Sequence, residues 1–269
     1  MSEKEILVWF PRLKALFPEG INTSYIGSIK SRYEVWILFN LIEILKPSEA
    51  YRIDFELDPT SMKFSEKKTL SLNLGTGSVA EAKNLHDALI SVVPATVLRF
   101  SDGSALSIFY QSYVPQRFQS HLGGIRPDIF LVKGEFTLNF MDAGRILRDG
   151  DGSVHKELLE VWFGNNIYMI VDEVRTTEDP SVVKYGLHAG DENFPVYALI
   201  ECKESEVAYQ GRRGATLQDY LLINCKKLIL FTMVPPPALI PASYKVVLDR
   251  SLGSEKSMMQ MQLKDILVG

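Results

Sequence analysis

Two short apolar segments with acidic residues near one end constrain the fold of this chain most strongly. They are Ile125–Val132, which reads IRPDIFLV, and Val196–Lys203, which reads VYALIECK. Apolar runs of this length are typical of buried strands. Alternate residues of a strand share a face, so Asp128 faces the core side of its strand, and Glu201 and Lys203 share a face. A core-directed carboxylate is costly unless it is paired or binds a cation, so these strands predict a polar site.

The composition favours an intracellular globular protein. The 269 residues are 46% apolar with a formal net charge of -4, and this length allows one large domain. We find no apolar stretch that could span a bilayer and no secretory signal, so no membrane is expected. Two cysteines, Cys202 and Cys225, form no disulfide framework, which favours the cytoplasm. The mild acidity disfavours coating nucleic acid through bulk charge, but it allows a locally basic cleft.

Periodicity and turn signals predict a mixed α/β (α+β) sheet flanked by helices. Alternation or apolar runs predict strands over 51–74, 126–132, 167–175, 195–203, 227–234 and 243–248. A hairpin over 95–110 is expected to turn at Asp102-Gly103. Helices are predicted over 5–17, 29–46, 79–92, 154–163, 215–226 and 258–267, and 176–193 is predicted to be irregular.

The two acidic segments together resemble the PD-(D/E)XK motif of a nuclease superfamily. The matching residues are Pro127-Asp128 and Glu201-Cys202-Lys203. The resemblance implies a restriction-endonuclease-like fold in which Asp128, Glu201 and the backbone carbonyl of Cys202 bind Mg²⁺, with Mn²⁺ as a substitute. It also implies that Lys203 orients or activates the attacking water. Asp128 capping a turn, and Glu201 with Lys203 forming a structural ion pair, are the alternative interpretations.

The spacing between the two halves of the motif is long. Asp128 and Glu201 are 73 positions apart, which implies an insertion at about 136–193. The expected organisation is a helical extension over 1–28 and one nuclease-like domain over 29–269. A rival second half is Glu173-Val174-Arg175, which is closer to Asp128 but carries Arg where Lys is expected.

A helix near the N-terminus carries a further resemblance. Tyr33-Glu34-Val35-Trp36, followed later by Arg126-Pro127-Asp128, resembles the nuclease domain of McrC-type restriction subunits. Glu34 lies at helical spacing with Leu38 and Leu41 on the expected buried stripe, whereas Asn40 is expected on a wetter side. The resemblance implies that Glu34 joins the metal site. Pairing of Glu34 with an arginine is the alternative.

Four further residues are candidates for binding substrate. Arg126 precedes the first motif, and Arg212 and Arg213 lie in a glycine-flanked loop where they could contact phosphate. Gln218 is favoured over Tyr220 on the helix predicted over 215–226, because residues two apart do not share a helical face. A solvated loop and an ordinary helix residue are the alternatives.

These features predict a metal-dependent nuclease, with DNA favoured over RNA and endonuclease action favoured. A restriction, defence or mobile-element context is expected, with a homodimer or a separate ATPase or specificity subunit as partner. One alternative is a catalytically decayed nuclease fold that only binds nucleic acid or a partner. Another is an accidental motif, in which Asp128 and Glu201 lie far apart. The four histidines show no zinc-ligand spacing.

Overall fold

The structure of the protein is a computed structural model. It describes residues 3–22, 29–61, 63–74, 84–114, 126–148, 150–175, 183–189, 196–205, 217–223, 225–236, 240–248 and 256–268. No helix within these ranges is long and apolar enough to cross a membrane.

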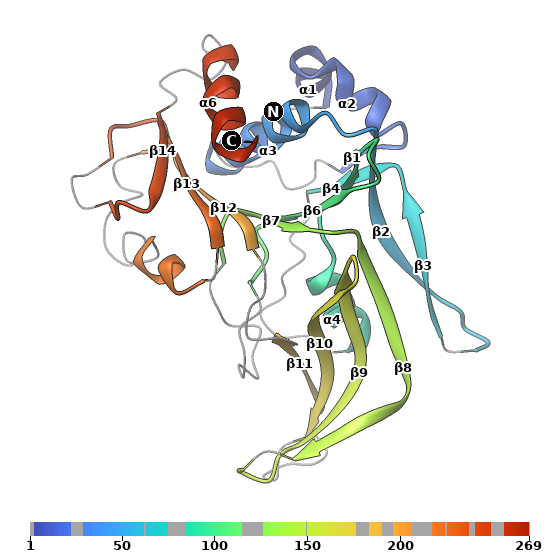
Figure 1. Ribbon diagram of the computed structural model, residues 1–269. Helices are drawn as coiled ribbons and strands as arrows, with labels where there is room; N and C mark the ends of the chain where they lie inside the picture. The colour runs from blue at the N-terminus through green and yellow to red at the C-terminus, as the bar shows by residue number, and fades with distance from the viewer. Residues whose placement is uncertain are drawn as a thin grey trace.

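Eight strands of the described chain form one mixed sheet, the main sheet (Figure 1). Their order across the sheet is β14 (Tyr244–Leu248), β13 (Cys225–Thr232), β12 (Val196–Lys203), β7 (Ile129–Lys133), β6 (Ala105–Tyr110), β5 (Thr96–Arg99), β2 (Glu49–Leu57) and β3 (Phe64–Thr69). The β12, β13 and β14 strands run parallel, and every other neighbouring pair is antiparallel. The predicted mixed sheet is confirmed, and the hairpin between β5 and β6 turns at Gly103, whose φ is +82°.

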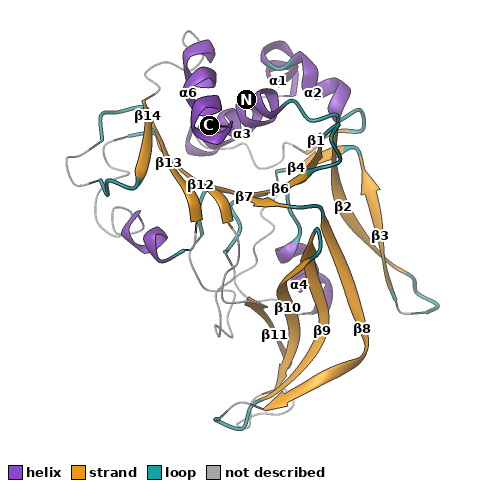
Figure 2. Cartoon of the chain, viewed as in Figure 1, coloured by secondary structure: helices purple, strands orange, loops and turns teal. Residues whose placement is uncertain are grey.

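Helices cover one face of the main sheet (Figure 2). They are α1 (Glu3–Trp9), α2 (Pro11–Leu16), α3 (Ile29–Leu45) and α6 (Lys256–Val268), beside the short parallel pair β1 (Gly20–Asn22) and β4 (Ser71–Asn73). The central helix α3 is buried on almost every side, because Trp36 packs edge-on against Phe10 at 5.0 Å and Gln260 of α6 donates to Asn40 at 2.9 Å. Asn40 is therefore fully buried, and its expected place on a wetter side was wrong.

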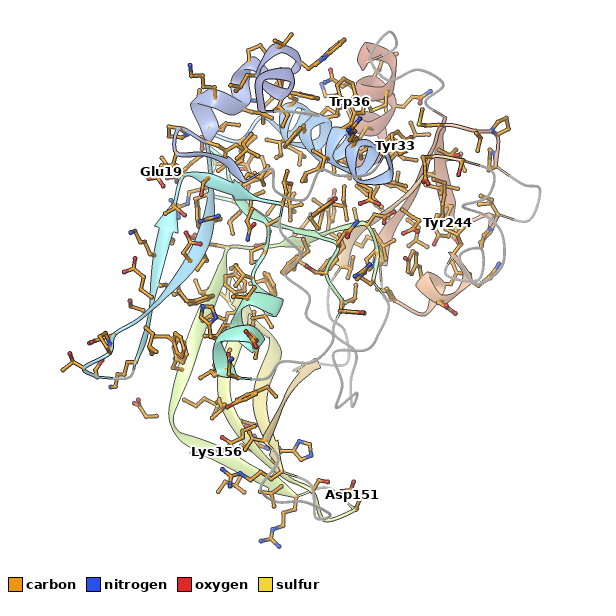
Figure 3. All side chains as sticks on the ribbon, turned by 180° about the vertical axis from the view of Figure 1, so that it is seen from behind. Glu19, Tyr33, Trp36, Asp151, Lys156 and Tyr244 are labelled. Atoms are coloured by element: carbon orange, nitrogen blue, oxygen red, sulfur yellow. The ribbon has the colours of Figure 1, made fainter. Side chains whose placement is uncertain are left out.

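The other face of the main sheet carries the helix α4 (Leu85–Val92) and a second sheet, which we call the arm (Figure 1). In the described residues the arm has four antiparallel strands in the order β11 (Val183–Ala189), β10 (Asn166–Arg175), β9 (Val154–Phe163) and β8 (Phe136–Arg148). Figure 3 places Asp151 and Lys156 at its far end. The insertion expected between the motif strands thus coincides with a separate sheet.

The arm corrects two predictions about local structure. The segment 154–163 was predicted to be a helix, but it is the strand β9, whose odd-numbered residues His155, Glu157, Leu159, Val161 and Phe163 are the buried ones. The segment 176–193 was predicted to be irregular, but its described part is the strand β11. Pairing with neighbouring strands decided both segments.

A phenylalanine cluster joins the arm to the main sheet. Phe109 of β6 and Phe130 of β7 stack in parallel with their ring centroids 4.5 Å apart. Phe163 at the end of β9 meets Phe109 edge-on at 5.9 Å and Phe136 at 5.8 Å. All four of these residues are at most 2% exposed, so the arm covers this part of the main sheet.

A polar cluster at Glu135, beside the start of the arm, predicts acid sensitivity. Partial burial raises the pKa of Glu135, but hydrogen bonds from Lys68, Tyr51 and Arg99 outweigh it and lower the pKa to about 2 from an ordinary 4.5. A depressed folded-state pKa adds stability above pH 4.5 that is lost as the pH falls from 4.5 towards 2. Because the side chain is 30% exposed, we expect Glu135→Gln to lower the unfolding free energy by only about 1–2 kcal/mol at pH 7.

Urea unfolding of the parent and Glu135→Gln at a series of pH values measures this effect. The two stability curves should converge below pH 4.5. Glu49→Gln is the matched control, because Glu49 also contacts Arg99 but is 42% exposed. Curves that stay equally far apart down to pH 2 would rule out the role of the Glu135 charge.

Candidate functional site

The candidate site lies at one end of three adjacent strands of the main sheet. Tyr110, the last residue of β6, pairs with Ile129 at the start of β7, and Ile129 pairs with Ile200 of β12. Residues 201–203 therefore continue past the start of β7 and lie beside Asp128. This register brings the two halves of the predicted motif to the same end of the sheet.

Asp128 is hydrogen-bonded to both neighbouring strands. Its Oδ2 accepts a hydrogen bond from the backbone N–H of Cys202 at 2.7 Å, and its backbone carbonyl accepts one from the N–H of Gln111 at 2.8 Å. Asp128 is 5% exposed. Asp128 and Glu201 are therefore neighbours across two strands and do not lie far apart, as the alternative of an accidental motif requires.

The rival residue Glu173 lies elsewhere. It is on β10 in the arm, and its Oε1 pairs with Arg175 at 2.7 Å. The strand that contacts Asp128 is β12, so Glu201-Cys202-Lys203 is the second half of the constellation.

Glu201 and Lys203 form a buried ion pair on one face of β12. Lys203 Nζ lies 2.5 Å from Glu201 Oε1, and the Tyr220 hydroxyl donates to Glu201 Oε2 at 2.9 Å. Both charged residues are 4% exposed. Burial, and next the negative charge of Asp128, raise the pKa of Glu201 to about 7, although Lys203 and Tyr220 act to lower it. The charged form of Glu201 is therefore disfavoured by burial and by Asp128, in spite of its contact with Lys203.

Glu34 approaches the same end of the sheet from the helical face. It is fully buried, as predicted, and its Oε2 accepts hydrogen bonds from the Tyr110 hydroxyl at 3.1 Å and from the Gln111 side-chain amide. Burial raises the pKa of Tyr110, and the charges of Glu34 and Asp128 raise it further, so Tyr110 lies within the field of both carboxylates. Gln111 joins Glu34 to Asp128, because its side chain contacts one and its backbone the other.

Gln111 has an unusual backbone conformation. Its φ is +47°, in the left-handed region that a residue other than glycine, asparagine or aspartate seldom adopts. Such conformations persist where the surroundings over-determine them, and they cluster at functional sites. Neither Tyr110 nor Gln111 was predicted as a site residue. A glutamine at the end of a strand gives no sequence signal for this conformation, so only the tertiary structure reveals it.

The contacts favour Tyr220 over Gln218. The helix predicted over 215–226 was wrong in extent, because the described part has one helical turn at 217–219 and a 3₁₀ turn at Tyr220–Leu222, and β13 starts at Cys225. Gln218 is exposed, whereas Tyr220 is 1% exposed and reaches Glu201. Burial and the charge of Glu201 raise the pKa of Tyr220, so its hydroxyl stays protonated.

The remaining candidates have different surroundings. Arg126 is exposed, with its guanidinium carbon 5.9 Å from the centre of the Tyr113 ring, and its backbone carbonyl accepts from Tyr220 at 3.2 Å. The side chain of Cys202 is fully buried on the helical face, opposite Glu201. Arg212 and Arg213 lie outside the described residues.

The oxygen atoms of the candidate site determine which metal ion it could bind. Among the described residues, no group of three or more His, Cys, Asp and Glu side chains is placed to hold a metal ion. Two carboxylates, those of Asp128 and Glu201, lie on adjacent strands, with the backbone of Cys202 between Glu201 and Lys203. Mg²⁺ commonly uses only one or two protein carboxylates together with waters and substrate phosphates. The two carboxylates are oxygen donors of the kind that Mg²⁺ uses, and further ligands would have to come from water or substrate.

Comparison of the chain with protein-family models, with curated proteins and with solved structures finds no match.

Proposed function

We propose that the protein is a metal-dependent nuclease that hydrolyses phosphodiester bonds, with DNA as the favoured substrate. The observation that carries the proposal is the contact between the two halves of the motif, in which Asp128 accepts a hydrogen bond from the Cys202 backbone, next to the buried Glu201–Lys203 pair. The contact supports the proposal, because the resemblance implies that these residues act together at one site.

The carboxylates of Asp128 and Glu201, with the backbone carbonyl of Cys202, would hold Mg²⁺ or Mn²⁺. When bound, such an ion would neutralise charge on the scissile phosphate and make a water molecule more acidic. The burial of both carboxylates supports a cation here, because burial and their mutual repulsion raise the pKa of Glu201 and a bound cation would favour its charged form.

Lys203 supplies a fixed positive charge next to the reacting phosphate. Its ammonium is held by Glu201, so little reorganisation is needed when negative charge develops on the phosphate oxygens. Tyr220 fixes the other oxygen of Glu201, and Gln111 fixes Glu34 relative to Asp128. Tyr220 and Gln111 are therefore positioning residues in this proposal, and Glu34 remains the proposed further carboxylate of the metal site.

The biological setting follows from the resemblance to McrC-type subunits. It favours an endonuclease of the cytoplasm in a restriction, defence or mobile-element system, acting as a homodimer or with a separate ATPase or specificity subunit. Arg126, Arg212, Arg213 and Gln218 remain proposed contacts to substrate.

We expect the protein to nick supercoiled plasmid DNA with Mg²⁺ or Mn²⁺, and Asp128→Asn to reduce the rate at least 100-fold. The amide oxygen of Asn can still accept the Cys202 N–H, so the variant should fold, but the negative charge is lost. Gel electrophoresis of the plasmid, with and without chelator, measures the rate, and thermal unfolding checks the fold.

Glu173→Gln is the control, because Glu173 lies in the arm and pairs with Arg175. It should cut as fast as the parent. If Asp128→Asn cuts as fast as the parent, the proposed site is wrong. If the parent retains DNA in a gel but does not cut with either metal, the decayed binding module is the better reading.

A further inference from the structure

A cavity of about 250 Å³ lies beside the candidate site. Tyr110 belongs to both, because it lines the cavity and its hydroxyl donates to Glu34. The other walls come from β2, from α4 and from residues 93–95, which lead into β5. The site and the cavity thus lie side by side at the same end of the main sheet. The site is at β12, β7 and β6, and the cavity is at β6, β5 and β2.

The size of the cavity limits what can enter it. Pockets for drug-sized ligands measure roughly 300–1,000 Å³, so a cavity of about 250 Å³ admits a smaller group. A single nucleobase is such a group, whereas a base pair is not.

The lining is half polar and carries balanced charge. Arg52 Nε pairs with Asp54 Oδ2 at 3.0 Å, and Thr69 holds the same Asp54 oxygen at 2.7 Å. With Asn73 and Ser112, these residues offer hydrogen-bond donors and acceptors without an excess of positive charge. This chemistry suits the polar edge of an uncharged base better than it suits a phosphate.

The rest of the lining is aromatic or apolar and suits the flat face of a base. The imidazole of His86 and the side chain of Ile90 lie four residues apart on one face of α4, and both residues are exposed. Val93 and Pro94 continue this wall. A base would lie against these side chains as bases lie against apolar and aromatic walls in other nucleic-acid sites.

We propose that this cavity, the base pocket, binds one unpaired nucleobase of the strand whose phosphate lies at Asp128 and Glu201, an inference that rests on the proposed function. Asp128 precedes β7 and Ala95 precedes β5, two strands away at the same end of the main sheet, so the pocket lies within a few nucleotides of the proposed cut. The substrate class is therefore DNA with an unpaired or extruded nucleotide near the cut.

The test uses a short single-stranded DNA oligonucleotide that carries one 2-aminopurine, whose fluorescence falls when the base stacks. It is titrated with the full-length protein in the presence of a chelator, so that no cutting occurs. The parent should quench the fluorescence. Ile90→Asp places a charge in the apolar wall and should weaken binding about tenfold and remove most of the quenching. Ile90 is 37% exposed, so the fold should tolerate the change.

Ile146→Asp is the matched control. It makes the same change of charge on the arm, at a residue that is 65% exposed, and should bind and quench like the parent. Equal behaviour of the two variants, or no quenching by the parent, would overturn the base pocket. Failure of the proposed function would give a different result. The parent would then not cut DNA with metal, but it would still quench the fluorescence, and Ile90→Asp would still fail to quench it.

Discussion

Lys203→Met is expected to slow DNA cleavage strongly and to destabilise the fold. Loss of the positive charge should lower the cleavage rate about 1,000-fold, at the upper end of what one fixed transition-state contact contributes. Removing one partner of a buried ion pair leaves the other without compensation, so the unfolding free energy should fall by about 3–5 kcal/mol at pH 8. Cleavage of plasmid and urea unfolding are the two measurements.

The pH dependence of this variant follows from Glu201. Burial and Asp128 raise the pKa of Glu201 to about 7 even with Lys203 present, and Lys203 acts to lower it, so its removal raises that pKa further. A raised folded-state pKa gives stability that is present below the unfolded value and is lost as the pH rises through the folded value. The stability lost in Lys203→Met, relative to the parent, should therefore be largest near pH 8 and become smaller towards pH 5.

A double variant separates stability from catalysis. Glu201→Gln combined with Lys203→Met removes both charges of the pair and should regain most of the lost stability, but it should not cut DNA. If the double variant is as unstable as Lys203→Met alone, the loss of stability arises from the lost packing of the Lys203 side chain. It does not then arise from the buried charge of Glu201 left without its lysine. If Lys203→Met cuts DNA at the parent rate, Lys203 has no role in the reaction.

Phe163→Ala is expected to cause the largest loss of stability among changes outside the candidate site. Phe163 is 1% exposed and meets both Phe109 and Phe136, so its removal opens a cavity where the arm joins the main sheet. Truncation of a buried phenylalanine typically costs about 3–5 kcal/mol. Urea unfolding followed by circular dichroism measures the change.

Leu147→Ala is the control for that change. Leu147 is also in the arm but is 38% exposed, so its truncation should lower the unfolding free energy by less than about 1 kcal/mol. A loss of this small size in Phe163→Ala would mean that the arm is held to the main sheet by contacts other than the phenylalanine cluster.

The sequence predicted the strands of the site well, because their patterns are local. The apolar run before Glu201 and the period of two are unambiguous, and the structure buries Asp128, Glu201 and Lys203 at one end of the sheet. Glu34 was placed correctly on a buried side of α3 because helical spacing is local as well.

Other elements depend on contacts that a single sequence does not reveal. The segment Val154–Phe163 mixes charged and apolar residues, and its pairing with β8 on one side and β10 on the other makes it a strand. Gln111 is drawn into the site by Glu34, 77 positions earlier, and by Asp128. No local pattern encodes either contact.

The arm also affects how the site assembles during folding. The hydrogen bond between Cys202 and Asp128 joins residues 74 positions apart, which is a slow contact to form from an open chain. Consecutive strands of the arm pair with each other, so the arm can form through local hairpins. At its base, Gly134 has a φ of +116°, and a Cβ there would lie 2.6 Å from the Phe163 backbone, so only glycine allows this close approach. A folded arm makes the connection between the two motif strands short and compact. Most of the entropic cost of bringing Asp128 close to Glu201 is therefore met when the arm folds, before these two strands pair.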